Sequence, residues 1–212
     1  MKKEIYIIGA GTYGEAMFEL ATHCGFEVAG FYDDDKKKIN QLVMDVRVKG
    51  TIQYLLSQDL EDKDFAVAIG DNALRTKIMN HIREKGGNTP SLIHKSAEIS
   101  KSAEIGIGVY IQPKAVIWTK VKIENDCIIS PLSLICHHSI MKKGSLLSNL
   151  SSIGSNIIVG DHVFIGMGST IMTGVKQIGS NSIIGAGSVV IHDVPPNTVV
   201  AGIPAKFIRN NK

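Results

Sequence analysis

The sequence predicts a mixed fold, in which a Rossmann-like α/β domain with a short parallel sheet (residues 1–88) precedes a parallel β-helix of hexapeptide repeats (residues 89–212). Three observations predict this fold. Apolar strand-like segments alternate with helical segments before Ser91, and beyond Ser91 an aliphatic residue recurs at every sixth position. The chain is also 44% hydrophobic but only 6% aromatic, with 21 glycines, which favours a core of stacked aliphatic side chains.

The first part of the chain has the alternating pattern of a parallel sheet with crossover helices. We expect strands at residues 4–8, 27–32 and 64–69, and helices at residues 13–24 and 72–86, the second helix ending at Gly86-Gly87. A full dinucleotide-binding fold contains two βαβαβ units, and only half of it fits before Ser91. A single nucleotide is therefore the expected ligand, and a nicotinamide oxidoreductase is disfavoured.

The rest of the chain is a repeat of six residues. An aliphatic residue occupies fourteen consecutive positions of the repeat, and a small or β-branched residue follows each one four positions later. The register slips by one residue at Gln177 and resumes at Ile178. Six residues hold a short strand and a turn, and three such units close a triangular coil of about 18 residues, whose open faces favour an oligomer. The aliphatic positions are Ile93, Ile99, Ile105, Ile111, Ile117, Ile123, Ile129, Ile135, Met141, Leu147, Ile153, Val159, Ile165 and Ile171.

Composition excludes several classes of function. The net charge is +3, from 23 basic and 20 acidic residues, and no basic cluster is longer than Lys36–Lys38, so no nucleic-acid binding is expected. The cysteines Cys24, Cys127 and Cys136 lack metal-ligand spacing, which predicts reduced thiols and no metal site. Because the chain has neither a run of 18 apolar residues nor a cleavable leader pattern, we expect a cytoplasmic protein without membrane insertion.

Glycine and polar residues follow each of the three predicted strands of the α/β domain. After the first strand, a glycine-rich loop opens a helix and would present backbone N–H groups to a phosphate. After the second, a run of aspartates stands where a Rossmann fold places a carboxylate for ribose or base contacts, or forms only a solvated turn. After the third, Asp71 either faces a ligand or only caps the next helix. The expected substrate-binding residues are Gly9, Gly11, Thr12, Tyr13, Gly14, Asp33, Asp34, Gly70, Asp71, Asn72 and Arg75.

Several motifs together link the chain to a known family. They are the glycine-rich loop, Tyr32-Asp33-Asp34, residues 68–72 (Ala-Ile-Gly-Asp-Asn) with Arg75, residues 92–97 (Leu-Ile-His-Lys-Ser-Ala) and the closing residues 200–206 (Val-Ala-Gly-Ile-Pro-Ala-Lys). With them, about residues 1–210 resemble the sialic acid O-acetyltransferase NeuD family of sugar acyltransferases, especially the PglD-like bacillosamine-pathway members that N-acetylate UDP-4-amino-4,6-dideoxy sugars. The resemblance implies a left-handed β-helix, a homotrimer with sites between protomers, acetyl-CoA as acyl donor between neighbouring coils, and a nucleotide sugar held by the N-terminal domain.

The resemblance also assigns the catalytic residue. In the family, a catalytic histidine precedes an acidic residue, and the matching stretch here is residues 134–138 (Leu-Ile-Cys-His-His). His137 matches the general base, and His138 stands in place of the acid. A second family histidine falls at Leu146, and the histidine of the glycine-rich loop falls at Tyr13. An unperturbed imidazole, with a pKa of about 6.5, is mostly neutral at cytoplasmic pH and can accept a proton from an attacking amine, unless His137 is only a surface histidine.

For the cofactor, the resemblance points to two glycine turns and a basic residue near the C-terminus. Family backbone in these turns holds the pantetheine arm, while glycines there also serve as tight corners of a β-helix, and the two roles are compatible. Lys206 or Arg209 would meet the CoA phosphates. The expected cofactor-binding residues are Gly166, Gly168, Gly185, Ala186, Gly187 and Lys206.

These features predict an acetyl-CoA-dependent N-acetyltransferase that acts on a nucleotide-linked 4-amino-4,6-dideoxy sugar in bacterial surface glycan biosynthesis, with His137 as general base. One alternative is an O-acetyltransferase for a sialic-acid-type sugar. Another is a catalytically degenerate protein that only binds a nucleotide sugar. An amine-bearing or hydroxyl-bearing acceptor separates the two enzymes, and turnover of acetyl-CoA separates both from the binding protein.

Overall fold

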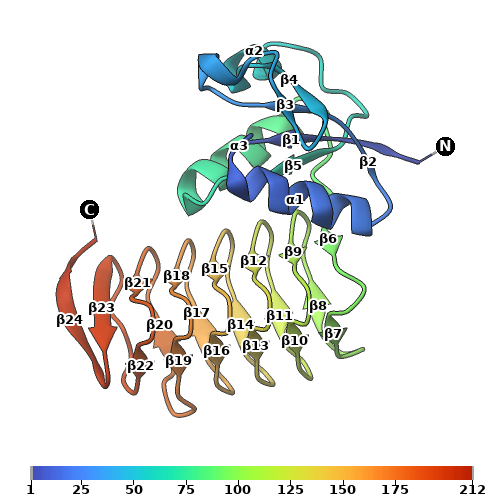
Figure 1. Cartoon of the computed structure of the whole chain (residues 1–212). Helices are drawn as coiled ribbons and strands as arrows, with labels where there is room; N and C mark the ends of the chain where they lie inside the picture. The colour runs from blue at the N-terminus through green and yellow to red at the C-terminus, as the bar shows by residue number, and fades with distance from the viewer. Residues whose placement is uncertain (1, 212) are drawn as a thin grey trace. The chain divides into compact units, whose positions relative to one another are not determined.

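The computed structural model describes residues 2–211 and forms two compact units, one up to Leu92 and one from Ile93 onward (Figure 1). The boundary expected from the sequence, at residues 88/89, lies a few residues earlier. Among the described residues, no helix is long and apolar enough to cross a membrane.

The first unit is an α/β unit around one five-stranded sheet, in the order β3-β4-β2-β1-β5. The pairs among β4, β2, β1 and β5 are parallel, and β3 pairs with β4 in antiparallel fashion. Its strands are β1 (Glu4–Ile8), β2 (Glu27–Tyr32), β3 (Leu42–Val43), β4 (Val46–Gly50) and β5 (Phe65–Val67). Its helices are α1 (Thr12–His23), the 3-10 turn η1 (Lys36–Lys38), α2 (Ile52–Leu56) and α3 (Asn72–Glu84).

The expected strands and helices of this unit are present with small differences at their ends. The third expected strand, residues 64–69, is shorter as β5 (Phe65–Val67), and the second helix stops at Glu84 instead of residue 86. The sequence analysis missed β3, β4 and α2. The buried side chains of Ile5, Ile7 and Phe31 contribute to the core of the sheet.

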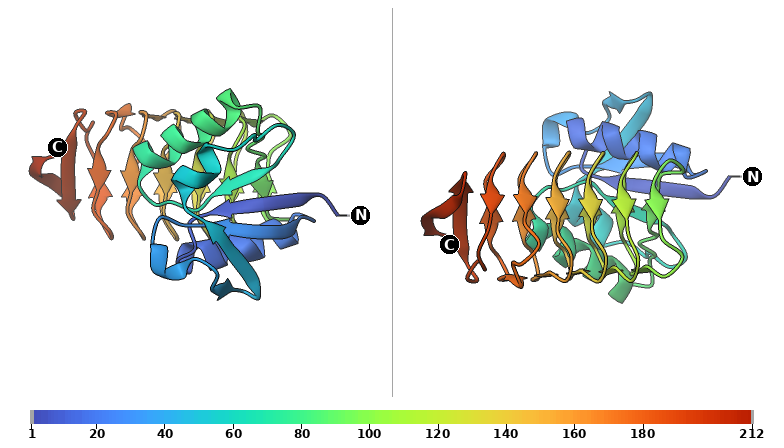
Figure 2. Two further views of the ribbon diagram at one scale, coloured as in Figure 1. Left: turned by 90° about the horizontal axis from the view of Figure 1, so that it is seen from above. Right: turned by 90° about the horizontal axis from the view of Figure 1, so that it is seen from below.

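The second unit is a parallel β-helix with three faces, whose coils are stacked side by side along one axis (Figure 2). The first face contains β7 (Glu98–Ile99), β10 (Val116–Ile117), β13 (Leu134–Ile135), β16 (Ser152–Ile153), β19 (Thr170–Ile171) and β22 (Val189–Val190). The second contains β8 (Glu104–Ile105), β11 (Lys122–Ile123), β14 (Ile140–Met141), β17 (Ile158–Val159) and β20 (Gln177–Ile178). The third contains β6 (Leu92–Ile93), β9 (Tyr110–Ile111), β12 (Ile128–Ile129), β15 (Leu146–Leu147), β18 (Phe164–Ile165), β21 (Ile183–Ile184), β23 (Thr198–Gly202) and β24 (Ala205–Asn210).

The coil length expected from the hexads is confirmed by the strand pairing. Val116 pairs with Leu134, and Leu134 pairs with Ser152, so each strand bonds to the strand one coil further on. Near the C-terminus, Ile158 pairs with Gln177, one residue later than the repeat requires. The register slip is therefore one extra residue in the turn between β19 and β20, and the ladder continues beyond it.

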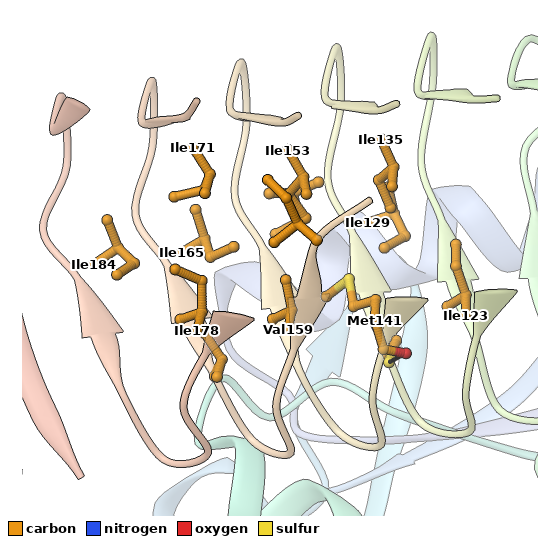
Figure 3. Close-up of a cluster of buried hydrophobic side chains, with 14 of the residues drawn as sticks. Ile123, Ile129, Ile135, Met141, Ile153, Val159, Ile165, Ile171, Ile178 and Ile184 are labelled. Atoms are coloured by element: carbon orange, nitrogen blue, oxygen red, sulfur yellow. Dashed lines mark hydrogen bonds between the residues drawn. The ribbon is translucent and has the colours of Figure 1, made fainter. Parts of the chain in front are cut away.

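The two positions of the hexad that point inward form the core of this β-helix. Ile129, Ile153 and Ile165 are fully buried, and Figure 3 shows such aliphatic side chains stacked along the inside. The small partner positions are buried too. Where such a partner is a serine, its hydroxyl is hydrogen-bonded to backbone, as Ser139 Oγ donates to Gly154 O of the next coil at 2.7 Å. These buried hydroxyls therefore cost little, because each has a backbone partner.

Candidate active site at a corner of the β-helix

The corner that joins the first face to the second carries the predicted catalytic histidine. We call it the histidine corner and define it by the turns at residues 118–121, 136–139 and 154–157, which follow β10, β13 and β16. His137 lies in the middle turn and is half-buried, and His138 beside it is exposed. Its position in the hexad explains the exposure, because residues of the turn point away from the aliphatic core.

Both ring nitrogens of His137 have a hydrogen-bond partner. Its Nε2 lies 3.0 Å from Ser155 Oγ, which comes from the next coil. Its Nδ1 lies 3.1 Å from Nδ1 of His138, and the two rings are nearly perpendicular, with centroids 5.2 Å apart. If His137 carries its proton on Nδ1 and donates it to His138, its Nε2 has a free lone pair that accepts the Ser155 hydroxyl proton. This tautomer is the one that a base acting through Nε2 needs.

A tryptophan ring lies beside the same imidazole, nearly parallel to it. Trp118, from the preceding coil, lies nearly parallel to His137, with an interplanar angle of 12° and ring centroids 6.1 Å apart. The Trp118 residue is 51% exposed, so a large part of the indole remains open to solvent. Residues of three successive coils, Trp118, His138 and Ser155, therefore contact the imidazole.

The backbone of the corner fixes the direction of His138. Its φ is +61°, and the same position in the coils before and after, Lys120 and Asn156, has φ of +55° and +60°. The left-handed conformation is thus a property of the turn and not of this residue. The His138 backbone N–H donates to Thr119 O at 3.0 Å, which ties it to the coil before.

The neighbouring thiol contributes little reactivity. Burial raises the pKa of Cys136, and a hydrogen bond with Ser155 partly opposes that effect. A thiol with a raised pKa is mainly protonated at neutral pH and is a poor nucleophile. This environment suits a small corner residue better than a nucleophile.

In the α/β unit, the expected phosphate loop lies at the end of β1 and the start of α1. Gly9 has φ of +102°, and a Cβ added to Gly14 would lie 2.2 Å from Gly9 O. Helix α1 begins at Thr12, and its N-cap residue Gly11 provides no side chain to cap the first turn. Backbone N–H groups at such a helix start attract an anion.

Asp33 organises this loop. Its Oδ2 accepts a hydrogen bond from Ala10 N at 2.8 Å and pairs with Lys38 Nζ at 2.9 Å, while Oδ1 accepts from Asp35 N at 2.9 Å. Partial burial alone would raise the pKa of Asp33, but the bonds from Asp35, Lys38 and Ala10 outweigh it and lower the pKa. The carboxylate therefore holds the loop in shape, in addition to any contact with a ligand.

Asp34 and Asp71 each accept a hydrogen bond from a backbone N–H at the start of a helix. Asp34 Oδ1 accepts from Ile52 N at 2.9 Å, at the first residue of α2. Asp71 is the N-cap of α3 and accepts from Leu74 N at 2.8 Å, so the capping alternative describes its contact in this structure. Asp34 also lines a groove of about 420 Å³ between α2 and α3, together with apolar side chains such as Ile78.

Arg75 and Asn72, both expected to bind substrate, lie in the first turn of α3. The Arg75 side chain is fully buried and donates from Nη1 to Ile69 O at 3.1 Å. Asn72 is 8% exposed. In this structure Arg75 supports the loop at the end of β5, where Gly70 lies, and its guanidinium is not on the surface.

The glycine turns assigned to the cofactor form a different corner, between the third and first faces. The turn after β18 holds Gly166 and Gly168, and the turn after β21 holds Gly185, Ala186 and Gly187. These two turns stack on one another: a Cβ added to Gly166 would lie 2.6 Å from Ala186 N. The turns are tight, which agrees with the expected role of these glycines as corners of a β-helix.

The basic residue expected at the cofactor also lies away from the histidine corner. Lys206 is exposed on β24, which extends the third face. The glycine corner and the histidine corner are separate edges of one β-helix, with the first face between them. A single chain therefore does not bring the expected cofactor residues and His137 together.

Comparisons with known proteins agree with this architecture. Residues 4–82 match the family model described as the PglD N-terminal domain. The structure of PerB from Caulobacter crescentus, in complex with CoA and GDP-perosamine, is 32% identical and covers 97% of both chains, with a TM-score of 0.87. The acetyltransferase domain of PglB from Neisseria gonorrhoeae, in complex with acetyl coenzyme A, is 30% identical and covers 98% of this chain and all of that one, with a TM-score of 0.90.

The chain belongs to the PglD-like sugar N-acetyltransferases of the hexapeptide-repeat superfamily. Some curated relatives match over shorter stretches: the Escherichia coli galactoside O-acetyltransferase is 47% identical over 73 residues, and the chain spans about a third (32%) of its length. Family membership confirms the predicted Rossmann-like unit, the left-handed β-helix and the acetyltransferase class.

The sequence analysis did not name two residues of the histidine corner that contact His137, Trp118 and Ser155. The repeat itself carries the signal that could have found them. Because strands one coil apart pair residues 18 positions apart, as Val116 pairs with Leu134, Ser155 must lie beside His137 in the next coil. In the coil before, the position that matches His137 is Thr119, and Trp118 is the residue ahead of it. Within residues 2–211, no three His, Cys, Asp or Glu side chains are arranged to hold a metal ion.

Proposed function

We propose that this chain transfers the acetyl group of acetyl-CoA to the amine of a nucleotide-linked 4-amino-4,6-dideoxy sugar, with His137 as general base, in bacterial surface glycan biosynthesis. The observation that supports it most is the imidazole of His137, whose Nε2 has a hydroxyl partner and whose Nδ1 has a second imidazole. Acetyl-CoA as the donor follows from the family, whose relatives were solved with CoA or acetyl-CoA. PerB was solved with GDP-perosamine, which supports a nucleotide-linked acceptor.

The proposed step needs one base and one oxyanion donor. The neutral amine of the sugar attacks the thioester carbon, and His137 Nε2 takes the amine proton in place of the Ser155 hydroxyl hydrogen bond. The tetrahedral intermediate then expels the CoA thiolate, which takes the proton from His137. A backbone N–H near this corner would stabilise the oxyanion.

The proposal includes an oligomer with sites between protomers. The glycine corner and the histidine corner lie on different edges of one chain, so a complete site requires the glycine corner of a second copy. A homotrimer with a threefold axis along the β-helices would bring unlike edges together three times. The uncapped start of α1 and the groove beside Asp34 are the proposed places for the diphosphate and the base of the nucleotide.

The test is thiol release from acetyl-CoA with UDP-, dTDP- and GDP-linked 4-amino-4,6-dideoxy sugars, and with a sialic acid as the hydroxyl-bearing acceptor. We expect turnover with one amino sugar and a loss of at least about 100-fold in His137→Ala, because the base is removed. The matched control is His23→Ala, since His23 is an exposed histidine in the last turn of α1 and belongs to neither corner of the β-helix. Full activity of His137→Ala would contradict the assignment of His137 as the general base. Turnover with sialic acid alone would favour the O-acetyltransferase. The absence of thiol release with every acceptor would favour a protein that only binds a nucleotide sugar.

His138 is proposed to orient His137 as the family acid would. Replacing it by Ala should lower kcat by about tenfold, less than the loss in His137→Ala, because the base stays but its Nδ1 partner is gone. His138→Asp places a carboxylate oxygen near the position of Nδ1 and should recover kcat, with the acid limb of the rate profile at higher pH, since a carboxylate stabilises the imidazolium. An Ala variant with unchanged kcat and unchanged pH profile would remove this role.

A further inference from the structure

Trp118 is the single tryptophan of the sequence, and it lies directly against the proposed base. It begins the turn after β10, where its backbone N–H donates to Ile135 O at 3.0 Å. The backbone is thus anchored to the next coil, while the indole projects from the corner. Since the residue is 51% exposed, part of the ring is free to meet a ligand.

The place of this ring relative to His137 limits what it can touch. An acceptor amine must come within about 3 Å of Nε2 to lose its proton. The indole is nearly parallel to the imidazole, and a centroid separation of 6.1 Å means that the two rings overlap only in part. Because the ring centroids are only 6.1 Å apart, a sugar whose amine reaches Nε2 has the exposed part of the indole within its reach.

The chemistry of an amino-deoxy sugar suits such a surface. In a 4-amino-4,6-dideoxy sugar, the carbon next to the amine-bearing carbon carries a methyl group, so the apolar edge and the amine are neighbours. Apolar groups gain by covering an aromatic face, and an amine that arrives protonated is attracted to the same face by the ring quadrupole. Both parts of the ligand therefore favour contact with the indole.

We propose that Trp118 is the specificity residue for the amino-sugar end of the acceptor, on which the apolar edge of the sugar stacks while its amine meets His137. This inference rests on the proposed function. The alternative is that the indole only holds the imidazole in place, in which case its loss would act on the base and not on acceptor binding.

Steady-state kinetics separate these roles. Trp118→Ala should raise KM for the nucleotide sugar about tenfold, with kcat, its pH profile and KM for acetyl-CoA changed by less than about twofold, and Trp118→Phe should recover most of the loss. The matched control is Ile107→Ala, because Ile107 is 54% exposed at a different corner. A fall in kcat with a shifted pH profile and an unchanged acceptor KM would overturn the proposal.

A binding experiment tests the contact without catalysis. Because the chain has one tryptophan, its fluorescence reports on this site alone. We expect the emission to change when GDP-perosamine or another nucleotide-linked 4-amino-4,6-dideoxy sugar is added to the oligomeric protein, and to stay constant with the nucleoside diphosphate alone. An equal change with the diphosphate, or no change with any amino sugar, would overturn it.

The two experiments also distinguish this inference from the proposed function. A sugar-dependent fluorescence change without acetyl transfer would support the contact at Trp118 and count against the transferase. Transfer that depends on His137 but is indifferent to Trp118→Ala would leave the transferase standing and remove the role of the indole.

Discussion

The β-helix and the α/β unit use their sequences in different ways. In the β-helix, two inward positions of each hexad hold the fold, and the outward positions and turn tips carry no comparable requirement. Trp118, His137 and Ser155 occupy such turns in three successive coils, so the site is built without disturbing the core. In the α/β unit, the loop that would bind phosphate also holds the fold, through Gly14 and Asp33. In the β-helix, the candidate functional residues are separate from those that hold the fold. In the α/β unit, the same residues would serve both purposes.

The largest effect on stability should come from the inward ladder of the β-helix. Ile153 is fully buried, and Ile153→Ala should lower the free energy of unfolding by about 2–5 kcal/mol, because a cavity remains between stacked coils. Ile158 points outward and is 43% exposed, so Ile158→Ala should cost no more than about 0.5 kcal/mol. Urea unfolding followed by Trp118 fluorescence measures both. Similar losses of unfolding free energy in the two variants would contradict the view that the inward positions of the hexad hold the fold and the outward ones do not.

The repeat explains why the β-helix was predictable. One aliphatic residue in six fixes which side chains face inward, and the three-hexad coil fixes which strands pair, so register followed from spacing alone. The one irregularity, ahead of Gln177, was also visible as a break in the spacing. The partners of His137 follow from the same coil length, although Ser155 and Trp118 do not stand out as isolated residues.

The missed parts of the α/β unit have a physical reason. Helix α2 (Ile52–Leu56) is too short to show a helical period and begins where Thr51 and Asp34 accept backbone hydrogen bonds. Strand β3 has two residues, too few for an alternating pattern. Strand β4 (Val46–Gly50) does alternate, with Val48 buried between exposed residues, but it is brief. The roles of Asp33 and Arg75 within the fold depend on contacts between distant segments, which spacing does not specify.

Gly14 tests whether the phosphate loop is constrained by sterics more than by helix propensity. In an ordinary helix, Gly→Ala is stabilising by about 1 kcal/mol. Here the added Cβ would lie 2.2 Å from Gly9 O, so Gly14→Ala should instead lower the free energy of unfolding by about 1–3 kcal/mol and weaken nucleotide-sugar binding.

The control for this change is Gly11→Ala in the same loop. Nothing lies within 4 Å of a Cβ added to Gly11, and its φ is −97°. As an N-cap change it should cost less than about 1 kcal/mol. Thermal unfolding and calorimetric titration with the nucleotide sugar compare the two variants. Stabilisation by Gly14→Ala would show that the loop yields and that its shape is not fixed by this contact.

The smallest effect concerns the carboxylate that holds the loop. The pKa of Asp33 is lower in the folded protein than in the unfolded chain, so ionised Asp33 contributes stability above its ordinary pKa, and this contribution is lost as the pH falls through the folded value. Asp33→Asn should therefore lower the free energy of unfolding by about 1 kcal/mol at neutral pH, since charge-assisted bonds to Ala10 and Lys38 become weaker. Below about pH 4 the difference from the unmodified protein should shrink, because a protonated carboxyl resembles an amide. Urea unfolding at a series of pH values, with the exposed Asp45→Asn as control, measures the difference, and a cost that stays constant as Asp33 is protonated would mean that its charge does not hold the loop.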